Sequence, residues 1–185
     1  MIFEPTPIAG AFVVRLEPRR DERGFFARTF CVDEFEAAGI VTAFVQQSLA
    51  HSERSGTLRG MHFQREPHGE DKFVRCTRGG IFDAIADLRP DSPSFRRVFT
   101  VVLDAAIGDA LFVPRGCAHG YQTLEDGTDV LYAMSSRYAP AAARAIRYDD
   151  PGLAIAWPLP EPILSAADRL APGLEAALAE VAGSC

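Results

Sequence analysis

Basic side chains lie in or beside apolar, strand-like segments of this chain rather than in a polar tail. Arg59 and His62 belong to the segment Leu58–Gln64, Lys72 lies just before the next apolar segment, and His119 lies after a later one. Unpaired charge is costly to bury, so strands seldom carry this many basic groups without a use for them. A histidine can act as a general base near neutral pH, and a lysine can stabilise a developing negative charge. These residue types therefore predict proton-transfer chemistry.

The spacing around these residues matches the two sequence half-motifs of the cupin β-barrel, the first of them in altered form. The second half-motif is complete and consists of Gly108, Pro114, Gly116 and His119. The places of the first are taken by Gly60, Glu66, His68, Lys72 and Gly79. A lysine thus stands where cupins carry an acidic metal ligand, and an ammonium group repels a cation while supplying positive charge itself. The spacing predicts a cupin that transfers protons without a metal.

Length and composition are those of one globular domain over residues 1–185. The hydrophobic fraction is 48% and the charged fraction 24%, which suffices for a full core. The net charge of −6 argues against a general nucleic-acid binder. The net charge does not exclude binding of a phosphorylated small ligand, because the first third of the chain is rich in arginine. No apolar run approaches the ~20 residues that would span a membrane.

The four cysteines show no metal-type spacing. They are Cys31, Cys76, Cys117 and Cys185. Cys76 and Cys117 lie in apolar strand patterns, so we expect both to be buried thiols. Because the chain also opens without a signal peptide, we expect a reducing, cytoplasmic location.

Turn residues divide the chain into short apolar segments, as in an all-β protein. Strands are expected over residues 11–16, 25–30, 43–47, 57–64, 73–77, 81–88, 97–103, 110–113, 130–135 and 145–148. A helix is expected over 33–38 with Asp33 as its cap, and a C-terminal helical segment over 164–185. In that segment the apolar residues of helical period are Leu174, Ala177, Leu178 and Val181. Together these predict a cupin jelly-roll β-barrel with a few short peripheral helices.

Two aspartates interrupt the apolar face of one predicted strand. Asp83 and Asp87 alternate with Ile81 and Ile85, so all four share a face. The simpler interpretation is that both carboxylates are hydrogen-bonded or paired with arginine. The alternative is that Asp83 lines a polar cavity and orients a basic side chain.

The parity of Leu58–Gln64 places Arg59 and His62 on opposite faces of an ideal strand. A bulge at Gly60, which lies between them, would bring both side chains to one face.

Ordered segments along nearly the whole chain carry a family resemblance. They are Asp21-Glu22-Arg23-Gly24-Phe25-Phe26, Leu58–Gln64, Lys72, Asp87-Leu88-Arg89, Ser92-Pro93, Pro114-x-Gly116-x-Ala118-His119-Gly120, Tyr132, Tyr138-x-Pro140, Asp150-Pro151, Ile155-x-Trp157-Pro158 and Leu164-Ser165-x-x-Asp168. In these segments the chain resembles the dTDP-4-dehydrorhamnose 3,5-epimerase family, cupin-fold enzymes that act on nucleotide-linked 4-keto-6-deoxy sugars. The resemblance implies an epimerase that inverts C3, C5 or both, with a nucleotide-diphosphate sugar as its partner and no cofactor.

The resemblance also implies roles for individual residues. His62 would be the catalytic base, Asp168 would orient it, Lys72 would steady the enolate, and Tyr132 would be the opposing acid. Substrate contacts would come from Arg23, Phe26, Gln47, Arg59, His119 and Tyr138. The family forms homodimers through an N-terminal strand, which implies that the N-terminal strands within 1–30 lie in a dimer interface.

The chemistry explains why these residue types are needed. A ketone at C4 acidifies the hydrogens on C3 and C5, and epimerisation removes one of these protons and returns one to the other face. The reaction needs a base with a pKa near neutrality, a donor for the enolate oxygen and an acid on the opposite side. The arginine fork suits the oxygens of a diphosphate.

Structural interpretations of three of these residues stay open. Tyr132 alternates with Val130 and Met134 and would then pack in the core. Asp168 would be an acid in the first turn of a helix. His119 would be structural in a glycine-rich loop.

Other functions also stay open. A metal-dependent cupin would use Glu66, His68 and His119, and a third possibility is a cupin that binds a sugar nucleotide without catalysis.

Three positions depart from the family pattern. Arg28 and Ala143 stand where acids are usual, and Leu49 stands where the family carries an asparagine after Gln47. These departures leave the nucleotide base and the number of inverted centres open.

Overall fold

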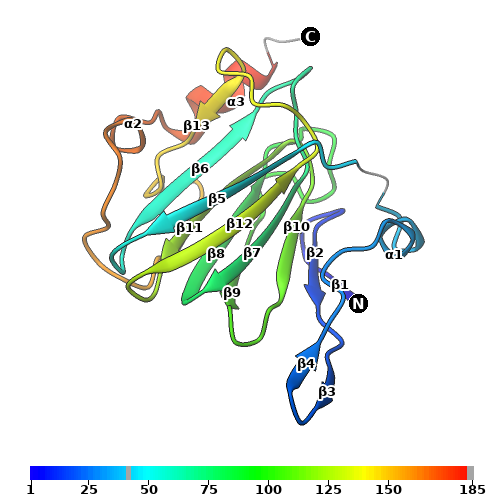
Figure 1. Cartoon of the computed structure of the whole chain (residues 1–185). Helices are drawn as coiled ribbons and strands as arrows, with labels where there is room; N and C mark the ends of the chain where they lie inside the picture. Colours follow the sequence, from blue (N-terminus) through cyan, green and yellow to red (C-terminus); the bar gives the residue numbers. More distant parts are fainter. Residues whose placement is uncertain (41–42, 183–185) are drawn as a thin grey trace.

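Two facing antiparallel sheets form the body of the protein in this computed structural model, which describes residues 1–40 and 43–182 (Figure 1). The six-stranded sheet contains, in order, β1 (Ile2–Pro5), β2 (Phe12–Arg15), β10 (Ala110–Val113), β7 (Lys72–Arg78), β12 (Thr128–Met134) and β5 (Gln46–Ser52). The five-stranded sheet contains β13 (Ala143–Ala145), β6 (Leu58–Gln64), β11 (Cys117–Thr123), β8 (Gly80–Asp87) and β9 (Val98–Asp104). The predicted all-β, jelly-roll type of fold is confirmed.

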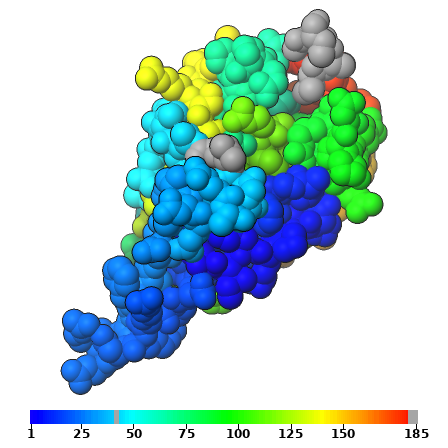
Figure 2. All heavy atoms as spheres, turned by 90° about the vertical axis from the view of Figure 1, so that its right-hand side faces the viewer, coloured from blue at the N-terminus to red at the C-terminus, as the bar shows by residue number. Residues whose placement is uncertain are grey.

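Smaller elements surround this body. A separate hairpin of β3 (Arg19–Asp21) and β4 (Gly24–Phe26) projects from it, as Figures 1 and 2 show. The helices are α1 (Val32–Ala37), α2 (Ala166–Arg169) and α3 (Leu174–Ala182). In the described part of the chain, no helix is long and apolar enough to cross a lipid bilayer.

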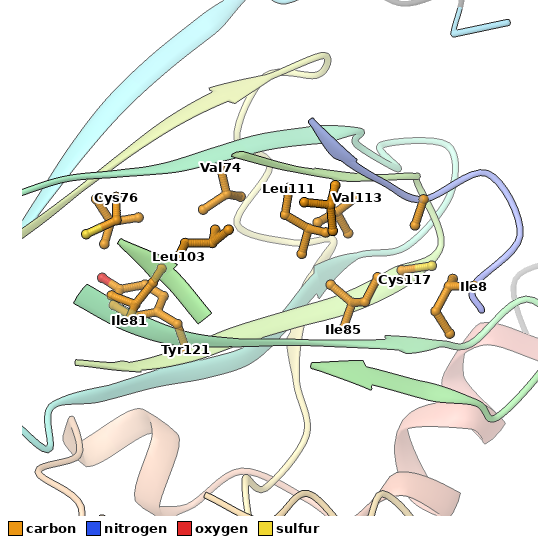
Figure 3. Close-up of a cluster of buried hydrophobic side chains, with 13 residues drawn as sticks. Ile8, Val74, Cys76, Ile81, Ile85, Leu103, Leu111, Val113, Cys117 and Tyr121 are labelled. Carbon is orange, nitrogen blue, oxygen red and sulfur yellow. The ribbon is translucent and has the colours of Figure 1, made fainter. Parts of the chain in front are cut away.

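The main hydrophobic core lies between the two sheets (Figure 3). Inward side chains of β7, β8, β9, β10 and β11 fill it, among them Val74, Ile81, Ile85, Leu103 and Leu111. Cys76 and Cys117 are both buried free thiols, as their strand patterns predict.

Two further clusters cover the outer faces of the sheets. Phe35 of α1 packs on the six-stranded sheet, where it contacts the rings of Phe73 and Phe112 edge to face. Leu174 and Ala177 of α3 pack on the five-stranded sheet. The C-terminal helix therefore covers the five-stranded sheet; the side chain of Val181 lies outside the described residues.

Asp87 is hydrogen-bonded and paired with an arginine, which was the simpler of the two interpretations of the aspartates. Its carboxylate accepts hydrogen bonds from Arg89 Nε at 2.8 Å, Ser92 Oγ at 2.5 Å and Ser94 Oγ at 2.6 Å. Burial acts to raise the pKa of Asp87, but these hydrogen bonds outweigh it and hold the pKa well below its ordinary value. This carboxylate holds the loop after β8 and takes no part in the chemistry.

Several expected elements differ from the structure. Strand β11 was not predicted, and His119 lies within it rather than in a loop. All seven residues of β11 are buried, so the strand shows no polar alternation that could reveal it. The strand expected over 43–47 is β5, which begins at Gln46, and the strand expected over 25–30 ends at Phe26.

The cap of the first helix was also predicted wrongly. Cys31, not Asp33, occupies the N-cap position of α1, and it forms no side-chain capping hydrogen bond. Asp33 lies in the first turn, where a negative charge favours the helix N-terminus without capping it.

Candidate active site

One half of the space between the sheets is polar. Strand register determines which side chains enter it, because directly paired residues point to the same face. His119 of β11 pairs with His62 of β6, and Tyr121 pairs with Arg59. From the opposite sheet come Lys72 of β7, Tyr132 of β12 and Ser48 of β5, the last two directly paired.

A bulge in β6 brings Arg59 and His62 to the same face. Three residues of β11, from His119 to Tyr121, oppose four of β6, from His62 to Arg59. Gly60 lies in this bulge with φ of 129°, a conformation that other residues rarely adopt. A Cβ atom at Gly60 would lie 2.5 Å from the Cα atom of Gly120, so no side chain fits there. The bulge considered in the sequence is therefore present.

Replacing Gly60 with alanine is expected to separate β6 from β11 and to move His62. Forcing the two backbones apart should lower the free energy of unfolding by about 1–3 kcal/mol. A shift of about 1 Å in a catalytic group should lower kcat by about 10²-fold. Gly39→Ala is the matched control, since Gly39 also has positive φ, 79°, but has open space around it. Denaturant unfolding and turnover of both variants test this, and equal kcat values in the two would contradict it.

His62 and Asp168 are hydrogen-bonded to each other within the site. His62 Nε2 lies 2.5 Å from Asp168 Oδ1, although the two residues are 106 positions apart. The His62 side chain is 46% exposed, whereas Asp168 is buried in the first turn of α2. An imidazole held in this way has one nitrogen oriented by the carboxylate, which leaves the other free for a substrate.

Asp168 is held in turn by Ser165, the N-cap of α2. Ser165 Oγ donates to Asp168 Oδ2 at 2.8 Å and accepts from the Asp168 backbone N–H at 3.0 Å. Burial acts to raise the pKa of Asp168, but the contacts with His62 and Ser165 outweigh it and leave the pKa below its ordinary value. Asp168 is thus both a helix N-terminal acid and an ionised partner of His62.

Lys72 bridges the two sheets. Its Nζ atom donates to the backbone oxygen of His62 at 3.1 Å and lies 3.4 Å from Glu70 Oε1. Burial lowers the pKa of Lys72, against the opposing charges of Glu70 and Asp83. A cation held beside His62 is suited to stabilising an enolate oxygen.

Asp83 orients a basic side chain, as the sharper interpretation proposed. The Nε2 atom of His119 lies 3.0 Å from Asp83 Oδ2, and both side chains are buried. The rings of His119 and Tyr132 meet edge to face with their centroids 6.0 Å apart. Tyr132 also packs against the interior core, so its surroundings combine polar and apolar contacts.

Arg59 adds a positive charge to this half of the interior. Its guanidinium donates to the His51 backbone oxygen at 2.9 Å. For Tyr121, Tyr132 and Asp168, burial is the strongest influence and acts to raise the pKa. The charge of Arg59 acts in the opposite direction on all three groups. Arg59 therefore favours the ionised forms of these groups.

Gln47 does not face the interior of its own chain, and its contact with a substrate stays a prediction. It pairs with Ala133, and its neighbours Gln46 and Ser48 have the opposite parity. Because Ser48 is paired with the inward-facing Tyr132, Gln46 and Ser48 face the interior and Gln47 faces outward. Leu49, exposed on the same outer face as Gln47, also lies away from the site.

Tyr138 lies in a pocket of about 340 Å³ at the edge of the site. Residues His62, Asp168 and Ala143 also line this pocket. The Tyr138 ring is exposed, and its backbone N–H donates to Gln46 Oε1 at 2.5 Å. The departure at Ala143 thus removes an acid from beside His62, whereas Arg28 lies elsewhere and pairs with Glu34 at 2.9 Å.

Arg23 and Phe26 are not brought to this site within one chain. Both lie in the β3–β4 hairpin, which extends away from the body (Figures 1 and 2). Arg23 pairs with Asp21 of the same hairpin at 2.6 Å.

The residues of the metal-dependent alternative do not cluster. Across residues 1–40 and 43–182, no group of three or more His, Cys, Asp or Glu side chains is arranged to hold a metal ion. His119 is turned toward Asp83 in the interior, while Glu66 and His68 are exposed in the loop between β6 and β7.

Residues 5–176 match the family model described as dTDP-4-dehydrorhamnose 3,5-epimerase. The chain belongs to this family. It is an epimerase, an isomerase acting on carbohydrates, and the resemblance drawn from its motifs is confirmed.

Individual relatives agree with the family assignment. The dTDP-4-dehydrorhamnose 3,5-epimerase of Salmonella typhimurium is 39% identical over 170 residues, which cover 90% of this chain and 92% of the relative. The solved epimerase of Mycobacterium tuberculosis superposes with a TM-score of 0.93 at 34% identity and covers 97% of this chain and 92% of that one. A 3'-monoepimerase from Streptomyces bikiniensis, solved with dTDP-quinovose, superposes with a TM-score of 0.87 at 36% identity. The superposition covers 97% of this chain and 90% of that one. This epimerase therefore has the fold of the family over almost its full length.

Proposed function

We propose that this epimerase acts on a dTDP-linked 4-keto-6-deoxy sugar and inverts one or both of the carbons beside the ketone. The observation that carries the proposal is that a histidine and a tyrosine, from opposite sheets, face the same polar interior. His62 is oriented by Asp168 on the five-stranded side, and Tyr132 comes from the six-stranded side. The dTDP part rests on the relatives, whose names specify dTDP sugars.

The proposed reaction has two proton transfers. His62 removes the proton from C3 or C5, and the electron pair moves onto the ketone oxygen to form an enolate. Lys72 stabilises that oxygen. Tyr132 then gives its proton to the same carbon from the other face. His62 ends protonated and Tyr132 ionised, so both exchange protons with solvent before the next turnover.

Deuterium uptake tests this function. In heavy water, dTDP-4-keto-6-deoxyglucose should gain one deuterium at each inverted carbon, and the position of the label together with the stereochemistry of the product shows whether C3, C5 or both are inverted. The same assay on sugars with other nucleotide bases tests the dTDP assignment. Tight binding of every substrate without any label would instead indicate a binding protein without catalysis.

Turnover is expected to continue in the presence of a chelator. Lys72 occupies the position of the acidic cupin ligand and lies beside His62, where it repels a cation. Activity measured after exhaustive treatment with EDTA should equal that of the untreated enzyme. Loss of turnover that a divalent cation restores would contradict this prediction.

We also propose a homodimer in which each β3–β4 hairpin completes the site of the other copy. Phe25 and Phe26 are 53% and 76% exposed on a projecting hairpin, which is an unusual place for two aromatic rings. Arg23 on the same hairpin has the fork that suits a diphosphate. We place this dimer in the cytoplasm, since Cys31, Cys76 and Cys117 are free thiols.

Mixing two inactive variants should restore activity if the hairpin acts on the other copy. A His62→Ala chain keeps its hairpin, and an Arg23→Ala/Phe26→Ala chain keeps its histidine. After random exchange of subunits, half of the dimers carry one intact site, so about a quarter of wild-type activity should return. A single species of monomer mass in sedimentation, or no recovery on mixing, would contradict the proposal.

A further inference from the structure

A tyrosine hydroxyl beside the proposed acid has no hydrogen-bond partner. Tyr121 is 1% exposed, and its hydroxyl pairs with no group in the described part of the chain. Burying a hydroxyl without a partner is unfavourable, and phenylalanine would fill the same space without that cost. The hydroxyl is therefore poorly explained by packing alone.

Tyr121 occupies a position from which it can reach Tyr132. It lies at one end of the interior cluster, near Cys76 and Ile81 (Figure 3). The centroids of the Tyr121 and Tyr132 rings are 6.3 Å apart, and that of His119 lies 6.4 Å from Tyr121. The three rings thus meet between the two sheets. Burial raises the pKa of both phenols; next in strength, Tyr132 acts to lower the pKa of Tyr121, and Tyr121 in its resting position acts to raise the pKa of Tyr132.

Ionisation of Tyr132 is difficult in these surroundings. Burial raises the pKa of Tyr132 well above its ordinary value, and its contact with Tyr121 and the nearby negative charge of Asp83 add to this effect while both phenols are neutral at rest. A phenolate formed there needs positive charge or hydrogen-bond donors, because little water can reach it. Arg59 supplies charge, and the unpaired hydroxyl of Tyr121 is a donor that needs to break no other hydrogen bond.

We propose that Tyr121 is a positioning residue for the acid, donating a hydrogen bond to the phenolate oxygen that Tyr132 acquires when it gives its proton to the sugar. The O–H bond of Tyr132 breaks, the new C–H bond forms on the sugar, and Tyr121 keeps its own proton throughout. Solvent later returns a proton to Tyr132. This inference rests on the proposed function, since it presumes that Tyr132 is the acid.

A double-mutant cycle tests the inference. Tyr121→Phe should lower the rate of inversion about 10- to 100-fold, the worth of one hydrogen bond to a charged group. Deuterium exchange at the carbon facing His62 should persist, because the base is unchanged. In a Tyr132→Phe background the same substitution should cost nothing further, since no phenolate forms. The midpoint of thermal unfolding should not fall, because only an unpaired hydroxyl is lost.

Tyr148→Phe is the control, since Tyr148 is not among the rings that meet Tyr132, and it should leave inversion unchanged; it lines another pocket with Arg147, Leu170 and Asp168. Undiminished inversion by Tyr121→Phe would overturn the inference. An equal loss from Tyr121→Phe in both backgrounds would overturn it too, and would indicate a packing role. Full inversion by Tyr132→Phe alone would instead refute the assignment of the acid in the proposed function.

Discussion

Replacing His62 with alanine is expected to abolish both inversion and solvent exchange at C3 and C5. The neighbouring histidine, His119, is also held by a carboxylate, Asp83, but it is buried, whereas the His62 side chain is 46% exposed and can meet a substrate. The loss should be at least 10²- to 10⁴-fold, the usual worth of one positioned base. Deuterium uptake and product stereochemistry, measured together, check the result.

His51 provides the control for this variant. Its Nδ1 atom lies 2.6 Å from Asp129 Oδ1, so it forms a similar histidine–aspartate pair, but it faces outward from β5. His51→Ala should keep both exchange and inversion. Full inversion by His62→Ala would refute the assignment of His62 as the base.

Replacing Tyr132 with phenylalanine is expected to separate exchange from inversion. The base still removes a proton and can return a solvent-derived one to the same face, so exchange should persist at one centre. Inversion should fall by about 10²- to 10⁴-fold because the acid on the opposite face is missing. The ring keeps its contact with His119 and with the interior core, so the fold should be retained.

The measurement for Tyr132→Phe is deuterium uptake beside the stereochemistry of the product. The unfolding midpoint of the variant serves as its control for packing. Undiminished inversion would show that Tyr132 packs in the core rather than acting as the acid, as its alternation with Val130 and Met134 also allows. Loss of exchange and inversion together would mean that Tyr132 acts in the first proton transfer.

The family and the reaction type could be read from local patterns. Glycines, histidines and a lysine at fixed spacings indicated a cupin with Lys72 in place of an acidic ligand, and the family match bears out that resemblance. Alternation along 81–88 placed Asp83 and Ile81 on one face, and both side chains are buried in the structure. These patterns depend on neighbours within a few residues, so a single sequence displays them directly.

Other features of the site depended on strand pairing. The resemblance assigned Gln47 to the substrate, whereas the face that Gln47 occupies follows only from the pairing of β5 with β12. Tyr121 was missed because β11 is buried at every position and was not recognised as a strand. Arg23 and Phe26 lie in a hairpin that no residue of the site contacts in the described part of one chain, so their place in the site awaits a test of the dimer.

The sequence by itself therefore determined the fold class and the family, and it predicted the chemical types of the reacting groups. Only the tertiary structure decided that His62 meets Asp168 across 106 positions, that a bulge at Gly60 turns Arg59 toward the same interior, and that Tyr121 lies beside Tyr132. The physical reason is that residue types and short spacings are local properties of a chain. The face that a side chain occupies, and the distant groups it meets, depend on register and sheet pairing, which exist only once the whole chain has packed.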